Sequence, residues 1–84
     1  MSKYFLVNNK QEWDWLMQKF EAEGIKWRAG LNATAMEPLT GYEDQVIELV
    51  DCHLIHAKRK VFVEALGVTN FIEVNRLMKG EYHG

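Results

Sequence analysis

Apolar residues in the first third of the chain follow two periods, and the change of period marks the first two elements. Four of them recur at i, i+3, i+4 and i+7, which places them on one face of a helix: Trp13, Leu16, Met17 and Phe20. Residues 25–29 instead alternate apolar and charged side chains, which is typical of a half-buried strand. The pattern predicts a helix over residues 10–23, followed at once by a strand.

Both ends of this helix carry recognisable signals. Asn9 is a good N-cap, and Glu12 three positions later completes the capping-box pattern. Gly24 suits the left-handed position that follows a helix, and Ile25 would then pack on Phe20, as in a Schellman motif. The helix boundaries are therefore the best defined in the chain.

The remaining apolar runs predict further strands and a second helix. We expect strands over residues 4–7, 45–51, 54–55 and 70–74, with a turn near Cys52-His53 and a helix over residues 57–66 that buries Val61, Phe62 and Ala65. The expected fold is a single α+β domain over residues 1–84, in the order β-α-β-β-(β)-α-β, with an antiparallel or mixed sheet covered on one face by the 10–23 helix.

Two alternatives stay open, because periodicity alone does not settle short apolar runs. Residues 40–66 also fit one long helix that ends at Gly67. In the second alternative the chain is mostly helical, and the segment Val63–Gly80 forms a helix-turn-helix with Asn70, Asn75 and Arg76 on its recognition helix.

Charge and composition narrow the classes of function. Ten basic and twelve acidic residues give a net charge of −2, which does not suggest an obvious nucleic-acid binder. Residues 29–57 contain five acids and no Lys or Arg, and Lys58-Arg59-Lys60 follows directly. No apolar run approaches the roughly 20 residues that span a bilayer, and the N-terminus lacks a signal-peptide pattern. We therefore expect a cytoplasmic protein without a membrane partner.

No set of residues forms a catalytic or metal-binding signature. Cys52, His53, His56 and His83 are too few, and too irregularly spaced, for a zinc site. No orienting residue or oxyanion hole marks a Cys-His nucleophile pair, and the glycine-rich phosphate motifs are missing. The carboxylates Asp44 and Glu48 read as surface acids. We expect no catalytic residues, no metal and no cofactor, and hence a protein that is not an enzyme.

Trp15 does not fit the apolar stripe of its helix. It lies about 160° from the centre of that stripe, so it is either covered by another part of the chain or offered to a partner. The irregular segment 30–44 is long for so small a domain, and such loops are often functional. The predicted partner contacts are Trp15, Lys26, Arg28, Met36, Tyr42, Glu43 and Asp44.

The segment Trp13–Gly30 also carries a family resemblance. Its W-x-x-L-M and G-x-K-W-x-x-G patterns resemble those of small accessory proteins encoded by phages and prophages of Gram-positive bacteria. The resemblance implies an α+β fold without transferable catalytic residues. It also implies a protein that binds and disables a host factor in the host cytoplasm, including defence nucleases such as CRISPR effectors.

A different class of function remains as the alternative. Lys58, Arg59 and Lys60, together with an aromatic platform, would suit a small nucleic-acid-binding or nucleotide-binding protein. A homo-oligomer is compatible with either reading.

Overall fold

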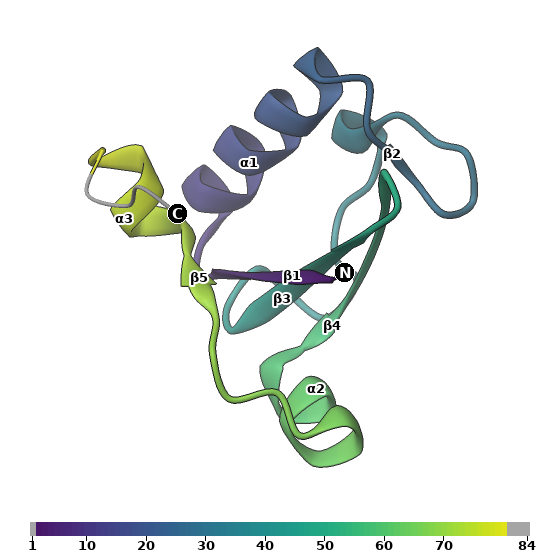
Figure 1. Cartoon of the computed structure of the whole chain (residues 1–84). Helices are drawn as coiled ribbons and strands as arrows, with labels where there is room; N and C mark the ends of the chain where they lie inside the picture. Colours follow the sequence, from purple (N-terminus) through teal and green to yellow (C-terminus); the bar gives the residue numbers. More distant parts are fainter. Residues whose placement is uncertain (1, 81–84) are drawn as a thin grey trace.

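A mixed five-stranded sheet with three α-helices makes up the computed structural model, which describes residues 2–80 (Figure 1). The elements in chain order are β1 (Lys3–Val7), α1 (Lys10–Ala22), β2 (Lys26–Trp27), the 3-10 turn η1 (Ala33–Ala35), β3 (Gln45–Val50), β4 (His53–Lys58), α2 (Arg59–Leu66), β5 (Ile72–Glu73) and α3 (Val74–Met78). This arrangement confirms the predicted α+β class. The mostly helical alternative and the single helix over residues 40–66 are both wrong.

The strands are arranged in the order β2-β4-β3-β1-β5. Strand β3 is antiparallel to both of its neighbours, β1 and β4. The two short edge strands are parallel to theirs, with β2 beside β4 and β5 beside β1. The sheet is therefore mixed, with a three-stranded antiparallel centre.

The predicted capping signals of α1 are confirmed. Asn9 Oδ1 accepts a hydrogen bond from the Glu12 amide at 2.8 Å, and Glu12 Oε1 accepts one from the Asn8 amide at 3.0 Å. At the other end Gly24 has a φ of 76°, and the Ile25 amide donates to the Phe20 carbonyl at 3.0 Å. That bond is the long-range bond of a Schellman motif, so the chain leaves the helix directly into β2.

Two clusters of apolar side chains lie on opposite faces of the sheet. Figure 1 shows α1 on one side of the sheet and α2 on the other. The larger cluster lies under α1, α3 and η1 and contains Trp13, Trp27 and Ile47. The smaller one is built from Leu6, Val46 and Phe62 under α2. Helix α2 is short, so it covers only one end of its face.

Several predicted boundaries need correction. Strand β2 has two residues, because a turn closed by the Gly30 amide on the Trp27 carbonyl at 2.8 Å pulls the chain away and leaves Ala29 exposed. Strand β4 continues to Lys58, so α2 starts two residues later than predicted. Strand β5 covers only two residues of the predicted strand 70–74, and α3 begins at Val74.

The expected buried face of the second helix is correct for Phe62 and wrong for the other two residues. Only Phe62 of α2 is buried, while Val61 is 47% exposed and Ala65 is exposed. Phe62 reaches down to Leu6 and Val46, and its ring meets Tyr4 edge-on at 5.6 Å between centroids. One aromatic side chain thus anchors the helix to the sheet.

The turn between β3 and β4 lies at Asp51-Cys52, one residue earlier than predicted. Val50 and His53 are paired across the hairpin, which leaves a two-residue loop. Both loop residues have positive φ, 48° at Asp51 and 68° at Cys52. Positive φ at both positions is the geometry of the hairpin turn that favours Asn or Asp followed by Gly. Cys52 therefore occupies a position where its Cβ is unfavourable.

Replacing Cys52 by glycine should stabilise the protein. We expect Cys52→Gly to raise the free energy of unfolding by about 1 kcal/mol, because glycine has no Cβ to oppose the left-handed conformation. Urea denaturation measures the change. Cys52→Ala is the control and should give no gain, since alanine keeps the Cβ; an equal gain from both variants would contradict the explanation.

Candidate binding surface

Two stacked tryptophans fix the long connection between β2 and β3. The indoles of Trp13 and Trp27 lie 5.8 Å apart at an interplanar angle of 18°, and both side chains are buried. Trp13 Nε1 donates to the Met36 carbonyl at 3.2 Å, and Trp27 Nε1 donates to the Ala33 carbonyl at 2.9 Å. Each indole therefore ties the connection to the core by a hydrogen bond.

A buried glutamine fixes the far end of the same connection. Gln45 Nε2 donates to Thr40 Oγ1 and to the Gly41 carbonyl, both at 2.8 Å. Gln45 Oε1 lies 3.3 Å from Nδ1 of His56, whose ring stands edge-on to Trp13 and Trp27. The polar groups of this buried glutamine are thus all paired within the chain.

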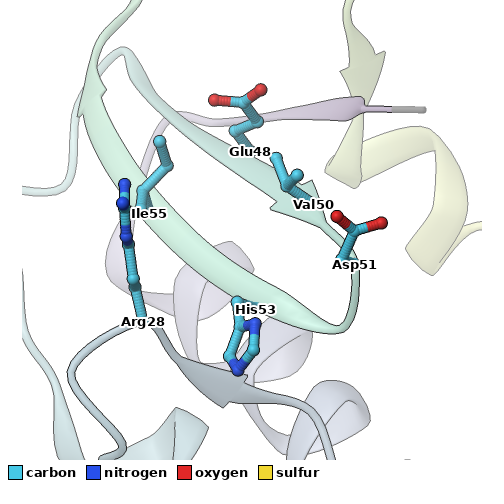
Figure 2. A pocket seen from close by; sticks show the side chains of 6 residues that line it. All are labelled: Arg28, Glu48, Val50, Asp51, His53 and Ile55. Carbon is cyan, nitrogen blue, oxygen red and sulfur yellow. The ribbon is translucent and has the colours of Figure 1, made fainter.

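The opposite face of the sheet is uncovered along β2, β4 and the end of β3. Register sets which side chains share this face: Val50 is paired with His53, and Glu48 with Ile55. Arg28 follows β2 and donates its amide to the Leu54 carbonyl at 3.0 Å, which places it beside Ile55. Six residues line a hollow of 390 Å³ here, which we call the open face: Arg28, Glu48, Val50, Asp51, His53 and Ile55 (Figure 2).

The open face has an apolar floor with charges on both sides. Ile55 is 36% exposed on the middle strand, β4. Arg28 lies on the β2 side of it and Glu48 on the β3 side (Figure 2). Within residues 2–80 the salt bridges join Lys10 to Asp14, Lys19 to Glu23, Arg59 to Asp44 and Arg76 to Glu73. None of these four involves a charge of the open face.

Glu48 was expected to be a surface acid, and this expectation is wrong. The residue is only 8% exposed, because Tyr4 and Ile55 are its direct neighbours on β1 and β4. Its side chain has no hydrogen bond or salt bridge to any other residue in the described range 2–80. The strand pattern of residues 45–50 places Glu48 opposite the α1 side, but only the fold shows that this face is partly enclosed.

The predicted contact residues lie on several surfaces. Lys26 and Arg28 lie together at the β2 edge, since Lys26 is paired with His53 of the open face. Trp15 is half-buried against the main core and borders a separate hollow, between α1 and α3, that also includes Gln18 and Met78. Arg28 therefore lines the open face and Lys26 borders it, whereas Trp15 lies elsewhere.

The other four predicted contacts belong to the connection before β3. Met36 and Tyr42 pack on the main core, and the Tyr42 ring meets Trp13 edge-on at 6.1 Å. The Glu43 carbonyl accepts a hydrogen bond from Lys58 Nζ. Asp44 Oδ1 lies 3.1 Å from Arg59 Nε. These groups already have partners within the chain.

Comparison of the chain with protein-family models, with curated proteins and with solved structures finds no match. Its class is therefore defined by its own geometry, as a small mixed-sheet α+β protein with one partly uncovered sheet face. Among residues 2–80 no three His, Cys, Asp or Glu side chains are grouped as metal ligands, and His83 lies outside the described residues. The described helices include none that is long and apolar enough to cross a membrane.

The environment of His56 predicts a pH-dependent stability. Burial against the edges of the two indoles disfavours the charged imidazole and lowers the pKa of His56 below its ordinary value of 6.5. The unfolded chain then binds more protons than the folded one near that pH, so the free energy of unfolding should fall as the pH drops below about 6.5. His56→Gln should flatten this dependence, measured by urea denaturation across the pH range.

The exposed His53 provides the matched control for this prediction. His53→Gln should keep the pH dependence of the wild type. The explanation fails if His56→Gln leaves the slope of stability against pH unchanged.

Proposed function

We propose that this chain is a non-enzymatic phage-encoded protein that binds a host protein and inhibits or modulates it. The resemblance of Trp13–Gly30 to phage accessory proteins supports this class. The open face supports the mode of action, because an uncovered sheet face with unpaired charges suits recognition of another protein. The proposed target class includes host defence effectors such as CRISPR nucleases, in the host cytoplasm.

The observation that carries the proposal is the composition of the open face. It combines a partly exposed aliphatic floor at Ile55 and Val50 with the charged side chains of Arg28, Glu48 and Asp51. Protein interfaces commonly have an apolar centre and a polar rim. Arginine is enriched among the residues that dominate binding energy, so Arg28 is the first candidate for a strong contact. Lys26 extends the basic side of the surface.

The nucleic-acid alternative is less well supported by the surroundings of the basic run. Lys58 donates to a backbone carbonyl, and Arg59 pairs with Asp44. Only Lys60 of the three has no such partner among the described residues. A phosphate backbone would have to compete with both intramolecular contacts, which favours a protein partner on the open face.

Charge reversal at one exposed position tests the proposed surface. We expect Arg28→Glu to lower capture of the host partner from a Gram-positive host lysate by about tenfold or more, since interface arginines often contribute more than 1.4 kcal/mol. Quantitative pull-down with mass spectrometry measures the captured amount. The melting temperature should stay close to that of the wild type, because Arg28 is exposed.

Lys60→Glu is the matched control, because it makes the same change of charge at an exposed residue of α2. Its capture of the partner should equal that of the wild type. Loss of capture with Lys60→Glu but not with Arg28→Glu would contradict the proposal and support the basic-run alternative.

A further inference from the structure

Glu48 is the most enclosed charged residue of the open face. The residue is more than nine-tenths buried, yet its carboxylate lines the 390 Å³ hollow and has no partner among residues 2–80. The enclosed side-chain atoms without a hydrogen-bond partner comprise, within residues 2–80, only Asn75 Oδ1, so the Glu48 oxygens meet the water of the hollow while the rest of the residue is held by its neighbours. A carboxylate held in place in this way loses little side-chain freedom when it pairs with a cation. The cation among the residues that line the hollow is Arg28.

Strand register explains why Arg28 does not compensate this charge. Glu48 is paired with Ile55 on β4, and Arg28 lies beyond Ile55 at the β2 edge. Neighbouring strands lie about 4.8 Å apart, so the backbones at Glu48 and Arg28, which are two strands apart, are separated by roughly 10 Å in total. Across the sheet, the Ile55 side chain therefore lies between the guanidinium of Arg28 and the carboxylate of Glu48.

We propose that Glu48 is the docking point for a lysine or arginine side chain of the partner protein. A cationic side chain entering the hollow pairs with the Glu48 carboxylate, and the aliphatic part of that side chain packs on Ile55 and Val50. On the β2 side of Ile55, Arg28 pairs with a carboxylate of the same partner segment. The partner segment thus carries a basic residue, an apolar residue and an acidic residue in that order. It lies across the strands of the open face.

This inference rests on the proposed function, because it names the chemistry of the partner at the same surface. The stability of the free protein shows whether the Glu48 carboxylate serves binding or holds the fold together. A structural carboxylate would stabilise the free protein, whereas an unpaired one does not. The neutral isostere Glu48→Gln should therefore weaken binding without lowering stability.

The experiment uses a random-peptide phage library selected on the immobilised full chain. We expect the enriched peptides to contain Lys or Arg and an acidic residue separated by an apolar residue. Glu48→Gln should weaken binding of these peptides by about tenfold or more, and its melting temperature should equal or exceed that of the wild type. Arg28→Gln should also weaken binding of these peptides, because it removes the cation that pairs with their acidic residue.

Asp51→Asn is the matched control, because Asp51 is a second, exposed acid that lines the same hollow. It should leave peptide binding unchanged. The inference is overturned if Asp51→Asn and Glu48→Gln weaken binding equally, if the enriched peptides lack a base, or if Glu48→Gln lowers the melting temperature.

Sedimentation of the free protein tests whether a second copy of the chain occupies the open face in place of a partner protein. A dimer that Glu48→Gln dissociates would mean that a second copy fills the open face, and it would overturn the assignment to a partner protein. The proposed function fails separately, if no host protein is captured in a manner that depends on Arg28. Peptides that bind through Glu48 without such capture would leave the docking chemistry supported and the host target refuted.

Discussion

The stacked indoles of Trp13 and Trp27 are the contact on which the rest of the structure depends. Trp13 comes from α1 and Trp27 from β2, so their stacking joins the helix to the edge of the sheet. Their Nε1 groups hold the carbonyls of Met36 and Ala33, which fixes a connection without regular periodicity. An aromatic pair of this kind contributes beyond its buried area through ring packing and its polar edge.

Most of the buried apolar side chains lie on the side of the sheet that α1 covers. The other side receives only the short α2, anchored through Phe62, and the end of the sheet near the β3–β4 turn stays uncovered. This uncovered end combines a partly exposed aliphatic floor with charged side chains, and the proposed binding of a partner rests on that combination. The separation of Arg28 from Glu48 by Ile55 leaves both charges available to a partner.

The sequence predicted the parts of the fold that depend on local signals. The caps of α1, the phase of Trp13 and the class of fold follow from residues within a few positions of one another. The boundaries of β2 and β4 were missed because long-range pairing and the Trp27–Gly30 turn decide them. Glu48 was missed for a similar reason, since its enclosure depends on Tyr4 and Ile55 from two other strands.

Site-specific photocrosslinking in host cells tests the central claim most directly, that the open face contacts the partner. A photoreactive amino acid is placed either at His53 on the open face or at Gln18 beside Trp15, both of which are exposed. We predict a specific crosslinked host protein from position 53 and none from position 18. A crosslink from position 18 alone would contradict the account and move the interface to the α1–α3 surface around Trp15.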